Sequence, residues 1–452
     1  MGQMNTFLSF TGLDFLFRFL PVFMAVFYLT PKGHKNKVLF AGSLIFYAMG
    51  SMEWAGVLLA LTLVNAALAK AGSVARGRLM IAFDLLIFAG IKAAAFFIPD
   101  FSVPFGMSFY ILRMISYQHD LSCKRLEKKN DLWTVAAYFT AFMHLPQGPV
   151  ASYRQMNDAK LLPSLTGKAF LERAENGISL VVAGLCMKVL LADKLSMMWN
   201  NIFRIGFESI STPLAWLGAL CYSLLLYYDF WGYSLIAAGL GMMMGYEYIP
   251  NFDHPYAAGS VSSFYRKWHI SLGTFFKNCL YIPLGGSRQG RFKTILNIMI
   301  VWLATGLWHM GSLNYLIWAG ALCLIILWEK TLGSVFLKKL PLIGHLHVLL
   351  LIPLSWIVFA MPDVASVEVY FLRLFPFAGE GINVSSYDVV KLLGSYFPYL
   401  IIAIVGCIPK VTEIFVRLKD SFLAKAVVFG MFWLCVYEIT RMSGNPFMYI
   451  DF

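Results

Sequence analysis

The sequence predicts an all-α protein that crosses a membrane many times, and three observations lead to this fold class. Of the 452 residues, 59% are hydrophobic and 13% are charged, and the mean hydropathy is +0.69. A water-soluble protein could not bury that much apolar surface. Apolar segments recur from one end of the chain to the other. Basic residues gather in the short stretches between them, as they do in cytoplasmic loops of membrane proteins.

Each apolar run predicts a membrane helix, although several are shorter than the roughly 20 residues that a full crossing needs. Short runs such as residues 38–48, followed by Gly50, suggest re-entrant or tilted helices buried in protein. We therefore predict about ten to twelve transmembrane helices plus re-entrant or interfacial half-helices around a central funnel. The apolar runs cover residues 14–30, 38–49, 54–69, 79–98, 105–118, 132–150, 176–192, 213–243, 294–310, 313–328, 343–361, 396–409 and 422–441.

These runs predict one integral membrane domain over residues 1–452. Residues 1–20 have no basic region before their apolar stretch and no clear small-residue cleavage site, so we expect a retained membrane segment there. The positive-inside rule predicts that the basic stretches 124–129 and 288–293 are cytoplasmic. We find no convincing internal repeat, which disfavours a secondary transporter.

One histidine lies within an uncharged apolar stretch. Residues 294–328 contain His309 and no Asp, Glu, Lys or Arg. An ionisable group at membrane depth is costly and is expected to face the protein interior or a wet cavity. Histidine is also the side chain best suited to accept a proton near neutral pH. We predict that His309 is a catalytic base. The alternative is a neutral histidine that hydrogen-bonds to a neighbouring helix.

Residues 251–293 interrupt the apolar pattern with basic and aromatic side chains. After Asp253 no acidic residue occurs until Glu329. Such a segment suits the cytoplasmic interface of a membrane, and the positive-inside rule alone would explain its charge. The functional interpretation is a basic collar that holds the phosphates of a cytosolic acyl donor. In that case the donor-binding residues are Arg266, Lys267 and Trp268.

Asp229 lies in the apolar run 213–243. A carboxylate at membrane depth needs a partner, and a histidine or an arginine is the natural one. We predict a supporting role for Asp229, either orienting a histidine or closing a buried ion pair. The seven cysteines are scattered singly and form no CxxC pattern, so we predict neither a disulfide framework nor a metal site.

From about residue 104 to the C-terminus, a series of motifs resembles those of the membrane-bound O-acyltransferases. The order matches the bacterial branch typified by alginate O-acetyltransferase. The resemblance implies that His309 is the central histidine of the family and that His269 is the second histidine of the active site. It implies that His269 orients the donor or stabilises developing charge. The motifs are PFGMSFYILRMISYQHD (104–120), FMHLPQGPVASY (142–153), YDFWGYSLIAAG (228–239), NFDHPY (251–256), FYRKWHISL (264–272), YIPLGG (281–286), TGLWH (305–309) and NPFMYIDF (445–452).

The resemblance implies an acyltransferase of the O-acetyltransferase type in the inner (cytoplasmic) membrane of a bacterium. We expect it to use acetyl-coenzyme A or another acyl thioester, with no permanently bound cofactor. The acceptor would be an extracytoplasmic glycan or a periplasmic or extracellular SGNH-type partner protein. We expect no nucleic-acid partner, because the basic residues lie between apolar runs.

Two alternatives remain open at this point. The first is D-alanyl transfer to teichoic acid from a carrier protein, although the YIPLGG motif favours the acetylating branch. The second, from another class, is a proton-coupled transporter or flippase in which His309 and Asp229 form a proton relay.

Overall fold

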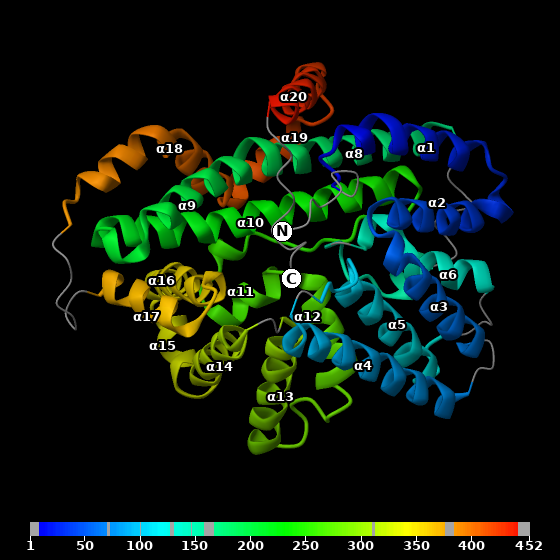
Figure 1. Cartoon of the computed structure of the whole chain (residues 1–452), viewed down its shortest axis with the longest axis horizontal. Helices are drawn as coiled ribbons and strands as arrows, with labels where there is room; N and C mark the ends of the chain where they lie inside the picture. Colours follow the sequence, from blue (N-terminus) through cyan, green and yellow to red (C-terminus); the bar gives the residue numbers. More distant parts are fainter. Residues whose placement is uncertain are drawn as a thin grey trace. The chain divides into compact units, whose positions relative to one another are not determined.

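The computed structural model describes residues 9–69, 73–99, 101–126, 131–145, 147–157, 167–309, 312–375 and 384–441 (Figure 1). Over these ranges the backbone is helical or irregular, and its β-type pairing is limited to one isolated antiparallel bridge between Phe252 and Trp268. The predicted all-α class is therefore confirmed. The motif at residues 445–452 lies outside the described residues.

Six helices within the described residues are long and apolar enough to cross a membrane. Two of them are covered very little by protein, since only 11% of the apolar window of α4 and 6% of that of α20 is buried. Such apolar surface needs lipid around it. The protein is therefore a multi-pass membrane protein, while the total of about ten to twelve crossings and the central funnel stay predictions. The six are α3 (Met52–Ala69), α4 (Val74–Phe97), α14 with its continuation η9 (Leu313–Gly333), α16 (Pro341–Ala360), α18 (Tyr387–Gly406) and α20 (Phe422–Arg441).

The chain divides into two compact units, and whether it acts as one integral domain stays a prediction. The first unit comprises Met1–Cys186, Gly232–Pro250 and Val428–Phe452, and the second comprises Met187–Trp231 and Asn251–Val427. The other elements that begin in the first unit are η2 (Phe15–Phe19), α1 (Leu20–Leu29), η3 (Lys32–His34), α2 (Lys35–Gly50), α5 (Met107–Ser122), α6 (Leu132–Thr140), η4 (Phe142–His144), α7 (Tyr153–Asn157), α8 (Lys168–Leu185) and η5 (Cys186–Ala192).

In the first unit, α5 is the central helix. Every residue from Met107 to Asp120 is buried, as expected for a helix that is covered on all sides. Its neighbours include α3, α4 and α6. Helix α2 ends at Gly50, so the short apolar run at residues 38–48 does form a short helix.

The second unit holds the basic segment and the histidines of the predicted site. Helices α11 and α12 have seven residues each, about 10 Å of helix, which is far too short for a crossing. They are half-helices of the kind that the sequence predicts. The remaining elements that begin in this unit are α9 (Asp193–Ile205), η6 (Phe207–Ser209), α10 (Thr212–Met243), η7 (Pro255–Ala257), α11 (Val261–Lys267), α12 (Ile270–Phe276), η8 (Lys277–Tyr281), α13 (Arg291–His309), α15 (Ser334–Lys339), α17 (Val364–Leu374) and α19 (Pro409–Leu418).

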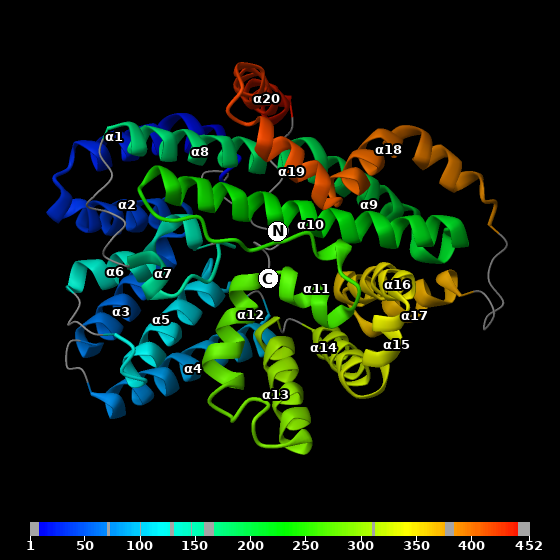
Figure 2. The ribbon, with the colours of Figure 1, turned by 180° about the vertical axis from the view of Figure 1, so that it is seen from behind.

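Helices α13 and α14 form a packed pair, and α14 also contacts α16 (Figure 2). Gly306 allows the close approach of the pair, because a Cβ at this position would lie 2.9 Å from the Cβ of Ala319. The two helices pack against each other, and only three residues separate His309 from Leu313 in the sequence, so they run antiparallel. The first turn of α13 and the last turn of α14 therefore lie at the same end of the pair.

Candidate active site

His309 is the last residue of α13 and is 6% exposed. Aromatic rings surround its imidazole. The ring centroid lies 5.4 Å from Trp318 and 5.3 Å from Phe359, both edge-on, and 6.1 Å from Tyr315 in a stacked arrangement. These rings come from α14 and α16, so three helices fix the position of the imidazole. The predicted interior location of His309 is observed.

His269 lies at the sharp bend between α11 and α12. It has a positive φ of 48°, a left-handed conformation that histidine adopts more readily than most residues. Two backbone hydrogen bonds hold the bend, from Asp253 N to Lys267 O (3.0 Å) and from Ile270 N to Asn251 O (2.9 Å). The segment that begins with NFDHPY therefore fixes the bend of the segment FYRKWHISL.

Asn251 orients the imidazole of His269. Its Oδ1 lies 3.1 Å from His269 Nδ1 and also accepts from Ser271 N (3.2 Å) and Ser271 Oγ (2.9 Å). Since Oδ1 is an acceptor, Nδ1 carries the proton and Nε2 holds the lone pair of the neutral ring. His269 lies outside the six spanning helices and is 5% exposed, and burial lowers its pKa to about 3. The ring is therefore neutral near pH 7.

Trp308 brings the two histidines into one site. Its ring centroid lies 4.4 Å from that of His309 and 6.4 Å from that of His269. Phe230 packs edge-on against His269 at 4.6 Å. The predicted catalytic pair thus shares a single aromatic environment, built from α10, α13 and the α11–α12 bend.

Asp229 is fully buried and its Oδ1 lies 2.8 Å from Lys188 Nζ. The same Nζ lies 2.7 Å from Asp193 Oδ1. Asp229 is therefore part of a buried ion pair, which is one of the two roles predicted for it. The partner is a lysine, whereas the sequence led us to expect a histidine or an arginine. Lys188 lies in η5, within an apolar run of the sequence. A lysine in such a run is the sequence feature that could have identified it as the partner.

The three residues predicted to bind the donor lie in different surroundings. Arg266 is exposed and lines a cavity of about 570 Å³. Lys267 pairs with Asp253, with 3.0 Å between Nζ and Oδ2. Trp268 is only 4% exposed and packs against Phe264 and Trp356, so its ring belongs to the core. Their binding of a donor stays a prediction.

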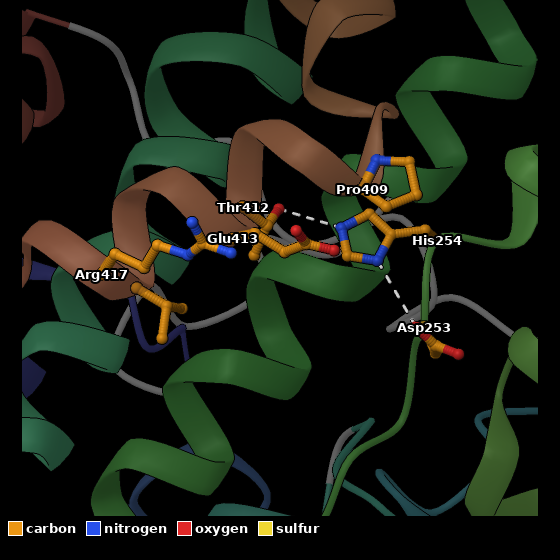
Figure 3. Close-up of a pocket in the computed structure, with 7 residues that line it drawn as sticks. Asp253, His254, Pro409, Thr412, Glu413 and Arg417 are labelled. Atoms are coloured by element: carbon orange, nitrogen blue, oxygen red, sulfur yellow. Dashed lines mark hydrogen bonds and ion pairs between the residues drawn. The ribbon is translucent and has the colours of Figure 1, made fainter.

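A second cavity, of about 400 Å³, lies beside Asp253 (Figure 3). His254 lies in it between two partners, with Nε2 at 2.9 Å from Thr412 Oγ1 and Nδ1 at 3.5 Å from Asp253 Oδ1. Glu413 and Arg417 of α19 complete its polar lining. Its contacts with α19 are those of a structural residue.

Sequence reasoning missed the residues that hold the site in place. Asn251 and Trp308 belong to motifs that the resemblance already uses, so the motifs located them without giving their roles. The amide of Asn297 donates to Gly286 O (2.9 Å) and Leu284 O (3.3 Å), which anchors the YIPLGG segment on α13.

Comparison with known proteins supports the motif-based expectation. The chain is 29% identical to the probable alginate O-acetylase AlgI of Pseudomonas putida, and the alignment covers 97% of this chain and 99% of the relative. It is 27% identical to the peptidoglycan O-acetyltransferase of Helicobacter pylori, over 67% of each chain. With the teichoic acid D-alanyltransferase of Bacillus subtilis it shares 23% identity over 47% of this chain and 55% of the relative.

Residues 87–359 match the membrane-bound O-acyltransferase family, MBOAT. The matched region contains both histidines, Asp229, and the segments that carry Asn251 and Trp308. The match makes the chain an enzyme and disfavours the transporter alternative. The protein is an O-acyltransferase and belongs to the membrane-bound O-acyltransferase family.

Proposed function

We propose that this enzyme transfers an acetyl group from a cytosolic thioester, acetyl-coenzyme A, to an extracytoplasmic polysaccharide or to a partner acetylase of the SGNH type. The protein would lie in the inner membrane of a bacterium. The nearly full-length similarity to an alginate O-acetylase supports the acetyl group and the polysaccharide acceptor. The similarity to a D-alanyltransferase covers about half of the chain and supports that alternative less.

In the proposed reaction, an acceptor hydroxyl attacks the thioester carbonyl. His309 removes the hydroxyl proton as the carbon–oxygen bond forms, and the carbon–sulfur bond then breaks. The proton passes from the imidazole to the departing thiolate, which leaves as a thiol. No net proton is taken up or released. His269, held by Asn251 with Nδ1 protonated, orients the donor or receives a hydrogen bond at Nε2.

One observation carries this assignment: His309 and His269 contact the same indole, that of Trp308. Two histidines, one at the end of α13 and one at the α11–α12 bend, are both buried among aromatic rings and form a site from which bulk water is largely excluded. Such a site favours transfer to a bound alcohol over hydrolysis of the thioester.

The test uses the purified protein in lipid vesicles with acetyl-coenzyme A labelled in the acetyl group. Release of coenzyme A thiol, together with label in an added glycan or partner acetylase, is the expected result. A parallel reaction supplies a D-alanyl carrier-protein thioester. Consumption of only the D-alanyl donor would contradict the proposal and select the alternative, and consumption of neither would contradict both.

A further inference from the structure

The cavity that Arg266 lines has a chemical character of its own. It lies where α11 packs against α14 and α16. Its volume of about 570 Å³ lies within the range of small-molecule sites. Gly344 of α16 meets the loop before α11 here, since a Cβ at Gly344 would lie 2.5 Å from Gly259 O.

Basic and hydroxyl groups dominate this lining. Its basic members are Arg266, Lys330 and His345. Ser260 and Ser263 add hydroxyls, whereas the hydroxyl of the third lining serine, Ser262, is buried. The Nδ1 of His345 lies 3.1 Å from Ala258 O. Because a carbonyl oxygen only accepts, the imidazole donates this bond through its Nδ1–H.

Glu329, the acidic residue of the lining, already has hydrogen-bond partners. Its Oε1 accepts from Val261 N (2.6 Å) and its Oε2 from Ser262 N (2.8 Å), while His347 Nε2 lies 3.1 Å from Oε1. These bonds satisfy the carboxylate and tie the start of α11 to the end of α14. The lining therefore carries two cationic side chains, Arg266 and Lys330, and one carboxylate that is already hydrogen-bonded. Because positive charge is in excess, the cavity favours an anion.

The cavity also lies at one end of two membrane-spanning helices. Lys330 is near the end of the span Leu313–Gly333, and Pro341 begins the span Pro341–Ala360. Large apolar side chains, Leu332, Leu342 and Leu346, are exposed nearby. Since α13 and α14 are antiparallel, this end is also that of Arg291 and Lys293, which the charge pattern predicts to be cytoplasmic.

We propose that this cavity binds a phosphate group through Arg266 and Lys330, with the hydroxyls of Ser260 and Ser263 as additional donors. Arginine and lysine at one site are the side chains that phosphate recognition in proteins uses most. Two sources supply such a group at the cytoplasmic membrane surface. One is the coenzyme A part of the acyl donor, and this choice of source rests on the proposed function. The other is the headgroup of an anionic phospholipid, and this choice is independent of the proposed function.

Two binding measurements distinguish the sources. The first titrates labelled coenzyme A into the purified protein in phosphatidylcholine nanodiscs, which contain no anionic lipid. The second measures by native mass spectrometry how much phosphatidylglycerol stays bound in detergent. Both compare the wild type with Arg266→Gln and Lys330→Gln. The matched control is Lys339→Gln, which removes one exposed charge from the same region but does not line the cavity.

For a donor phosphate, each cavity variant should weaken coenzyme A binding about tenfold, and Lys339→Gln should leave it within twofold. For a lipid phosphate, the cavity variants should lose retained phosphatidylglycerol and bind coenzyme A as the wild type does. Arg266→Lys keeps the charge and should fall between the wild type and Arg266→Gln, which separates lost charge from misfolding.

If neither ligand responds to the cavity variants more than to Lys339→Gln, the inference is wrong. The proposed function fails separately, if the wild type neither binds nor consumes acetyl-coenzyme A. In that case the phosphatidylglycerol arm still tests the cavity.

Discussion

Asn251 Oδ1 lies 3.1 Å from Nδ1 of His269, and this contact sets which nitrogen of the imidazole carries the proton. Asn251 is held in turn by Ser271, whose backbone N–H and hydroxyl donate to the same oxygen. A ring with a fixed tautomer and a fixed orientation suits catalysis better than one that rotates. The two histidines of the proposed site are thus held in different ways. The amide of Asn251 orients His269, and aromatic rings surround His309.

Replacing Asn251 with Ala should lower kcat because the imidazole of His269 loses its fixed tautomer. If Asn251 acts only through His269, the double variant with His269→Ala should be no slower than His269→Ala alone. Steady-state rates of the four proteins form the cycle. Additive losses would show that Asn251 acts independently of the histidine.

Replacing His309 with Ala should lower acetyl transfer at least about 100-fold, because a general base contributes at least that much. The protein should remain folded and inserted in the membrane. The measurement is labelled acetyl transfer in membranes matched for protein amount, with Trp328→Phe as a control on a partly exposed aromatic residue of α14 outside the site. Turnover close to that of the wild type would exclude His309 as the base.

Neutralising Arg266 and Lys267 together should raise KM for acetyl-coenzyme A more than it lowers kcat, because both are predicted to bind the donor. We expect the larger effect from Arg266, since it lines a cavity whereas Lys267 already pairs with Asp253. Initial rates against donor concentration test this for the double variant and for each single variant. A lowered kcat with an unchanged KM would place these residues in chemistry or folding instead.

Lys188→Met should destabilise the protein far more than Asp229→Asn does. The methionine variant leaves two buried carboxylates without their cation, which costs about 3–5 kcal/mol, whereas the asparagine variant retains one ion pair. Thermal unfolding in detergent measures the order. The triple variant that also carries Asp193→Asn and Asp229→Asn should recover most of the loss. A triple variant as unstable as Lys188→Met would show that packing of the lysine stem, not charge, is responsible.

The two ends of α13 should be accessible from opposite sides of the membrane. Single cysteines at Gln289 and Ser312, in a cysteine-free background, report on the two ends. A membrane-impermeant maleimide on intact cells should label position 312 and should label position 289 only after the membrane is opened. Labelling of both positions from outside, or of position 289 alone, would contradict transfer of an acyl group across the membrane.

The sequence by itself determined the all-helical membrane class, the family, and the two histidines worth testing. It could do so because hydropathy is a local property and because the motifs are continuous in the chain. His309 is conspicuous since residues 294–328 contain no Asp, Glu, Lys or Arg. The same local signals gave Asp229 and the basic stretch that contains Arg266.

Only the tertiary structure decided which side chains meet. Lys188 and Asp229 lie 41 positions apart in the sequence, and no periodicity relates them. Likewise, Arg266, Lys267 and Trp268 are consecutive, yet one lines a cavity, one pairs with Asp253, and one is buried in the core. Consecutive residues at the end of a short helix point in different directions, and the neighbours they reach come from distant segments. Pairing and burial depend on those distant neighbours, so they are properties of the packed fold.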